Sequence, residues 1–217
     1  MADYKFSNSL WITGNVEDKQ LQWGCGVSHR VAFKGELCRN GCIHFYEDEI
    51  LAVLMDVVDA EYMREPGHIL WRGRASGQRI TNGLKSGCER FTTIEPIEVP
   101  VVSAEQRIGF AILCSLELPQ SQNHVEWAAD WLSGADRTQQ SACAARAMVP
   151  EGNLPALLAT KTAVFSSRSA QVTAARTAIS VALTTRYSNR NIDFIGLAHK
   201  AMEVVGRPEE PGKELRT

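Results

Sequence analysis

The sequence predicts an α+β fold, in which a small β-rich head with two helices is followed by a mostly α-helical C-terminal tail. Two observations support this prediction. Residues 1–120 contain short runs of β-forming residues between glycine and asparagine turns, whereas residues 121–217 contain capped segments with apolar residues at helical spacing. We therefore expect a head domain over residues 1–120 and a helical tail over residues 121–217, with residues 207–217 disordered.

The head is predicted to be organised around a tight turn at Asn40-Gly41, within the segment Gly35–Tyr46. Asparagine and glycine both tolerate positive φ, so this dipeptide between apolar positions is typical of a turn that joins two strands. A helix is expected at Glu47–Val58, because Asp48 can cap it and the apolar residues that follow recur at helical spacing.

Further elements of the head are predicted from β-forming runs and from one helix cap. Ser103 and Gln106 form a capping-box pattern, which marks the start of a helix. The predicted elements are the strands His68–Ala75 and Cys88–Ile94, the loop Thr81–Gly87 between them, and the helix Ala104–Leu116.

The tail is predicted to be helical because cap residues precede its apolar runs. Asn123 with Glu126 and Asp136 with Gln139 are expected to open two helices, and Ile192–Val205 is expected to form the last one. Between them, Leu154–Tyr187 is rich in alanine and threonine and is expected to form one long helix. Its apolar residues at seven-residue spacing are Leu158, Phe165, Val172 and Ile179. Such a column packs on another helix, either inside this chain or on a partner.

The cysteines are dispersed in a chain long enough to build a core, which favours reduced thiols in a cytoplasm. The six cysteines are Cys25, Cys38, Cys42, Cys88, Cys114 and Cys143. The pattern Cys38-x₃-Cys42-x-His44 is the nearest approach to a zinc site, with Cys25, His29 or Cys88 as possible fourth ligands. No second cysteine pair completes it, so we expect no metal and no cofactor.

Composition and charge narrow the functional classes. The chain has 44% hydrophobic and 22% charged residues and a net charge of −2, which gives no general electrostatic reason to bind nucleic acid. No apolar run approaches the roughly 20 residues that cross a bilayer, and no secretory signal is visible. We therefore expect a cytoplasmic protein without membrane contact.

Basic residues around the predicted loop Thr81–Gly87 are the candidate ligand-binding residues. A phosphate loop is excluded, because Lys85-Ser86 lacks the preceding glycine spacing. If the arginines shared a face with the aromatic residues of the head, they would form a cationic, aromatic-lined concavity for a phosphate-bearing ligand. The candidates are His44, Tyr46, Trp71, Arg72, Arg74, Lys85 and Arg90. The alternative is a solvated outer face of an antiparallel sheet.

Several motifs of the chain together resemble a group of uncharacterised proteins found in phage and prophage genomes. The motifs are Leu37–Tyr46, Ile69-Leu70-Trp71, Asn82–Cys88, Glu105–Cys114, Trp131–Arg137 and Ile192–Ile195. The tail departs from the group, because threonine and serine replace much of its alanine. The resemblance implies a phage-encoded protein that acts in the bacterial cytoplasm, and it implies no catalytic residue.

Two functional hypotheses follow. The first is a phage accessory protein that binds and inhibits a host protein, such as an anti-phage defence component, without catalysis and with possible homo-oligomerisation through the tail. It is favoured because no Ser-His-Asp order, Gly-x-Ser-x-Gly or His-Glu-x-x-His motif is present. The second is an enzyme or sequestering protein for a nucleotide-like ligand, with an ADP-ribosyltransferase-like head.

Overall fold

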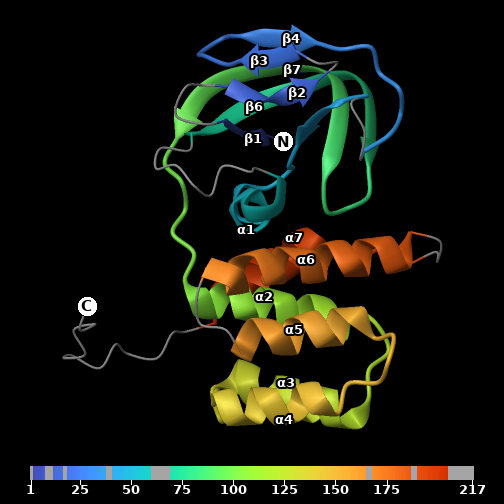
Figure 1. Cartoon of the computed structure of the whole chain (residues 1–217). Coiled ribbons are helices and arrows are strands. Elements are labelled where there is room, and N and C mark those ends of the chain that lie inside the picture. Colours follow the sequence, from blue (N-terminus) through green and yellow to red (C-terminus); the bar gives the residue numbers. More distant parts are fainter. Residues whose placement is uncertain are drawn as a thin grey trace.

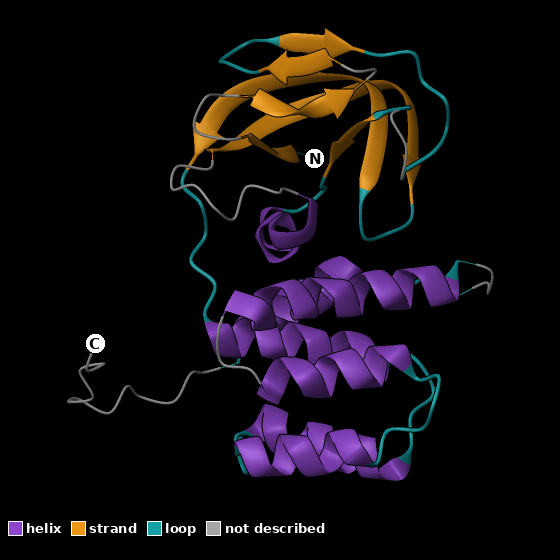
Figure 2. Cartoon of the chain, in the orientation of Figure 1, coloured by secondary structure: helices purple, strands orange, loops and turns teal. Residues whose placement is uncertain are grey.

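The computed structural model describes residues 2–7, 12–16, 19–37, 41–59, 69–164, 168–186 and 190–204. It confirms the predicted α+β class: the strands gather at one end, the helices form stacked layers at the other, and one helix lies between them (Figures 1 and 2). The strands are β1 (Asp3–Ser7), β2 (Ile12–Val16), β3 (Lys19–Gln22), β4 (Ser28–Arg30), β5 (Ile43–Phe45), β6 (Ile69–Thr81) and β7 (Ser86–Ile97). The helices are α1 (Glu49–Asp59), α2 (Ala104–Leu116), α3 (Gln122–Ser133), α4 (Gln139–Ala147), α5 (Leu154–Val164), α6 (Arg168–Thr185) and α7 (Phe194–Met202).

The antiparallel hairpin β6–β7 is the centre of the main sheet. Strand β1 pairs with β6, while β4 and β5 pair with different parts of β7. Both strands are longer than the predicted strands, because the predicted loop shortens to a tight turn. In that turn the Oδ1 atom of Asn82 accepts hydrogen bonds from the backbone N–H groups of Leu84 and Lys85, at 3.1 and 2.9 Å. Gly83 has φ 80°, which glycine adopts without strain.

The sheet closes on itself between its first and fifth strands. The backbone groups of Tyr4 and Tyr46 exchange two hydrogen bonds, of 2.7 and 2.8 Å, which connect β1 to the end of β5. The β6–β7 pair must curve to allow this closure, and its register shifts twice along its length. The enclosed face carries one hydrophobic core, whose largest members are Trp23, Phe45, Trp71 and Phe91.

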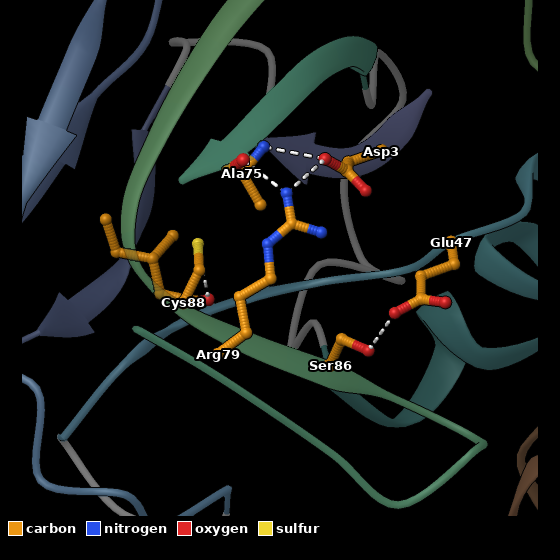
Figure 3. A network of polar contacts seen from close by, with 7 residues as sticks. Asp3, Glu47, Ala75, Arg79, Ser86 and Cys88 are labelled. Atoms are coloured by element: carbon orange, nitrogen blue, oxygen red, sulfur yellow. Dashed lines mark hydrogen bonds and ion pairs between the residues drawn. The ribbon is translucent and has the colours of Figure 1, made fainter. Parts of the chain in front are cut away.

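Polar side chains satisfy the backbone where β6 continues beyond the start of β1 (Figure 3). The N–H of Ala75 donates to Oδ2 of the buried Asp3 at 2.6 Å. The guanidinium of Arg79 donates to the carbonyl of Ala75 and lies 3.5 Å from the same Asp3 oxygen. On the neighbouring strand, Ser86 donates to the carboxylate of Glu47 at 2.8 Å. This network therefore has a structural role at the bend of the sheet.

A second core joins the sheet to the helices. It contains the apolar faces of α1, α2, α6 and α7, together with Leu70 from β6 and Leu84 from the hairpin turn. Polar contacts reinforce the same junction. Nε2 of His199 lies 2.7 Å from the carboxylate of Asp48, which also caps α1 as predicted. Helix α2, which falls within the predicted head, packs among α5, α6 and α7.

The helix caps agree with the sequence at some positions and differ at others. The capping box of Ser103 and Gln106 at the start of α2 is confirmed. Helix α3 is capped by Ser121 rather than Asn123, and α4 by Thr138 rather than Asp136. Asp136 instead accepts hydrogen bonds from the backbone N–H and the hydroxyl of Thr138. Several residues able to cap a helix lie close together in each segment, so pattern alone places the cap within a few residues.

The prediction of one long helix over Leu154–Tyr187 is wrong. Two helices, α5 and α6, occupy this region and pack side by side. Both helices bury small residues, which allow neighbouring helix backbones to approach closely. Alanines 156, 159, 174, 175 and 178 are all fully buried or nearly so. The buried threonine hydroxyls donate to carbonyls one turn earlier, as Thr160 does to Ala156 at 3.0 Å and Thr177 to Thr173 at 3.0 Å.

Gly41 is constrained by close packing rather than by its φ angle. Gly41 is not one of the described glycines with positive φ. Asn40 lies outside the described residues. A Cβ atom added at Gly41 would lie 2.7 Å from the Cβ of Lys34, whose backbone N–H donates to the Gly41 carbonyl at 2.8 Å. The corner therefore depends on a close approach of two chain segments.

We predict that Gly41→Val lowers the free energy of unfolding by about 1–3 kcal/mol, because the added side chain overlaps Lys34. Chemical denaturation measures this change. The double variant Gly41→Val with Lys34→Gly removes the overlapping Cβ and is expected to recover part of the loss. A single variant as stable as the wild type would contradict the role of this contact.

Candidate functional site

The aromatic residues predicted to bind a ligand are buried in the fold. Trp71 has 0% relative exposure and belongs to the core enclosed by the sheet. Tyr46 is also buried, packed in the core that joins the sheet to the helices. Both side chains are therefore taken up by packing, and the predicted aromatic wall of a ligand site does not form. The prediction that Tyr46 and Trp71 present a surface is corrected accordingly.

His44 and Lys85 lie apart from the predicted arginines. His44 is half-buried in β5, and its carbonyl accepts a hydrogen bond from Lys5 at 2.8 Å. Lys85 is half-buried in the turn of the β6–β7 hairpin. The arginines lie farther along the hairpin, so the seven candidates do not converge on one concavity.

The predicted arginines do come together, on the outer face of the sheet. Arg72 and Arg74 are alternate residues of β6 and are exposed, whereas Trp71, Gly73 and Ala75 between and beside them are buried. On β7, Arg90 lies opposite Ser76 of β6 and Arg30 of β4. We call this surface the arginine face and define it by Arg30, Arg72, Arg74 and Arg90. It combines three strands, β4, β7 and β6.

The charges of the arginine face are only partly neutralised. Arg72 forms an ion pair with Glu95 across the two strands. Arg30 donates from Nε to Glu89 at 2.7 Å, and this hydrogen bond is the main reason why the pKa of Glu89 is lowered. The side chains of Arg74 and Arg90 form no hydrogen bond or ion pair with any residue that the structure describes. Two guanidinium groups are therefore available on this face.

The predicted tail column is split between two helices. Leu158 is half-buried on α5, while Val172 and Ile179 are half-buried on α6 and pack against the core that joins the sheet to the helices. Phe165 lies outside the described residues. The column is thus not a continuous stripe on one helix, and Val172 and Ile179 contribute to internal packing. Self-association through this region stays a prediction.

No metal site forms among the described residues. No group of three His, Cys, Asp or Glu side chains in this part of the chain is arranged to hold an ion. Cys42 donates to the carbonyl of Glu36 at 3.3 Å, and Cys38 lies outside the described residues. Burial raises the pKa of Cys88 to about 12, so its thiol is not a nucleophile at neutral pH.

A serine–histidine pair occurs in the helical layers but lacks the geometry for catalysis. The side chains of Ser115 and His124 are buried, with Oγ and Nε2 2.9 Å apart. The Ser115 hydroxyl donates to the carbonyl of Ile112 at 2.8 Å, so Nε2–H of His124 donates to Ser115. The proton therefore points the wrong way for His124 to act as a base toward Ser115. The pair connects α2 to α3.

Sequence reasoning missed Arg30, which completes the arginine face. Its strand, β4, has only three residues and pairs with β7, which lies more than fifty positions later in the sequence. The alternation of Arg72 and Arg74 with buried residues was the signal available in the sequence.

Comparison of the chain with protein-family models, with curated proteins and with solved structures gave no match. Among the described residues, no helix has both the length and the apolar character needed to cross a bilayer. Function is therefore inferred from the geometry of the described residues.

We predict that His124 makes stability depend on pH. Burial lowers the pKa of His124 to about 4 in the folded chain, below the 6.5 of an exposed histidine. Its contribution is complete above pH 6.5 and is lost as the pH falls toward 4, because the unfolded chain then binds the proton more tightly.

The free energy of unfolding should fall by about 3 kcal/mol more in the wild type than in His124→Asn between pH 7 and pH 4. Urea denaturation at several pH values measures how the free energy of unfolding of each protein depends on pH. Subtracting the values of the variant from those of the wild type removes the contribution of the other titrating groups. Parallel slopes would show that His124 is not the group responsible.

Proposed function

We propose that this chain is a non-catalytic, phage-encoded accessory protein that binds and inhibits an acidic host protein, a component of anti-phage defence. The observation that supports the proposal is the arginine face, where four arginine side chains lie on three neighbouring strands. The phage origin comes from the motif resemblance, the inhibitory role in defence is the hypothesis favoured by the lack of a catalytic motif in the sequence, and the surface supports an acidic partner.

The arrangement of the arginines has an electrostatic cost within the isolated chain. Arg30 and Arg90 lie directly opposite each other on β4 and β7, and Arg74 lies diagonally across from Arg90. Like charges at such cross-strand positions destabilise a sheet. Carboxylates of a partner would remove this repulsion and would replace it with charge-assisted hydrogen bonds. The face is thus better suited to a complex than to the free protein.

The spacing favours an acidic protein segment. Arg72 and Arg74 are two residues apart on one strand, which separates their side chains by about 6.6 Å. Carboxylates at alternate positions of an extended segment repeat at the same interval. Nucleic acid fits less well: the net charge is −2, and no aromatic residue is among the large exposed hydrophobic side chains of the described chain.

The alternative of a nucleotide enzyme in the head loses support from the structure. Trp71 lies on the opposite side of β6 from Arg72, because neighbouring residues of a strand face opposite ways. The ring of Trp71 is therefore not available to a ligand on the arginine face. A surface whose exposed charges complement those of a partner favours protein docking.

We predict that bacterial host proteins captured by the purified chain depend on the arginine face. The double variant Arg74→Glu with Arg90→Glu reverses the two available charges and should lose the specific partner. The matched control Arg146→Glu with Arg176→Glu makes the same charge change at exposed positions of α4 and α6 and should retain it. Quantitative mass spectrometry compares the host proteins captured by the wild type and by the two double variants. An activity assay of the captured protein tests inhibition. Equal capture by both double variants would contradict the proposal.

We further predict that Arg90→Thr separates stability from binding. Threonine removes the charge opposite Arg30 and favours a strand, so the thermal midpoint should rise by about 1–3 °C at low salt. Affinity for the captured partner should fall at the same time. Scanning calorimetry and a binding titration measure the two effects. A variant that binds normally would show that Arg90 lies outside the docking surface.

A further inference from the structure

We infer that a cleft between the sheet and α6 is a separate binding site for a small organic anion, one with an apolar body and a phosphate or carboxylate group. Distant parts of the chain form the cleft: residues 35–37, residues 80–82 at the end of β6, residues 182, 183, 185 and 186 at the end of α6, and Arg190. Its volume is about 480 Å³, which falls within the range of small-molecule sites. None of its lining residues belongs to the arginine face, so the inference is independent of the proposed function.

One part of the cleft is apolar. Leu37 and Ile80 are half-buried, and Leu183 is 52% exposed although its helical neighbours Val181 and Ala182 are buried. A large aliphatic side chain that lines a concave surface and remains open to solvent is able to gain apolar contact when a ligand enters. The body of the ligand is therefore expected to be apolar.

Two arginines supply the charge on the same cleft. Arg190 donates from Nη1 to the carbonyl of Glu117 at 3.0 Å, which holds its guanidinium in place against the end of α2. Arg186 directly follows α6 and lines the cleft beside it. Glu36 is the single acidic residue among the described lining residues. A guanidinium that is already held in place binds an oxyanion at a lower entropic cost.

The position of the cleft fits this role. Small-molecule sites occur preferentially where two parts of a fold meet, because each part contributes a wall. Here the sheet contributes Ile80 and the helical layers contribute Leu183 and the two arginines. The turn that follows β6 is itself held by Asn82, whose side chain accepts two backbone hydrogen bonds. The walls of the cleft thus come from the ends of β6 and α6, together with residues 35–37 and Arg190.

The test uses 1-anilinonaphthalene-8-sulfonate, a fluorescent probe with an apolar body and one anionic group, titrated into the full-length protein. Wild type should bind it saturably. Leu183→Glu and Arg186→Gln should each weaken binding about tenfold or more, because one repels the anion from the apolar wall and the other removes a charged hydrogen-bond donor. Arg176→Gln, an exposed position of α6 outside the cleft, is the matched control and should bind as the wild type does.

Competition identifies the kind of anion. Displacement of the probe by adenosine monophosphate, or by octanoate, supports the inference and assigns a phosphate or a carboxylate ligand respectively. Displacement by inorganic phosphate as effectively as by either compound would overturn it, because the apolar wall would then contribute nothing. Equal affinity of the wild type, Leu183→Glu and Arg186→Gln for the probe would also overturn it. Both substituted positions are exposed, and circular dichroism verifies that the variants are folded.

Discussion

Closure of the sheet between Tyr4 and Tyr46 is the constraint on which the rest of the structure depends. Two short backbone hydrogen bonds join β1 to the end of β5, and the long β6–β7 hairpin has to curve to reach both. The curvature encloses Trp71 and Phe91 on one side and turns Arg72 and Arg74 outward on the other. The same curvature brings the hairpin turn against the helices, where Leu84 enters their core. One topological requirement thus defines the core, the charged face and the junction.

The bend also explains why the charged residue Asp3 is buried in the head. Ala75 lies beyond the start of β1, whose pairing with β6 ends at Asp3 and Gly73. Among the described residues, no strand therefore pairs with the N–H and C=O groups of Ala75 on the β1 side. Asp3 and Arg79 satisfy these two groups and neutralise each other (Figure 3). Buried polar backbone groups without partners are costly, so this pair is required by the fold. The charges of Asp3 and Arg79 therefore stabilise the bend, and those of the arginine face are the ones suited to binding.

The helical layers are held together by a different principle from that of the sheet. Their contacts use alanine and threonine, which bury little apolar area per residue but allow close helix packing. Burial leaves the hydroxyls of Thr160 and Thr177 satisfied, because each donates to a carbonyl of its own helix. Large side chains are concentrated where layers meet, such as Phe110 on α2 and Phe194 on α7. The end of α6, which belongs to these layers, and the end of β6 then form opposite walls of a cleft.

Local pattern was sufficient to predict the α+β class, the helix at Asp48 and the capping box at Ser103. These features depend on residues that are neighbours along the chain. The burial of Tyr46 and Trp71, the division of the tail into α5 and α6, and the addition of Arg30 to the arginine face depend on contacts between distant segments. An alternating strand has two faces, and its own residues do not show which face a distant aromatic or arginine will join. Tertiary packing made that choice here, because closure of the sheet directed one face of the hairpin inward and left the other to solvent.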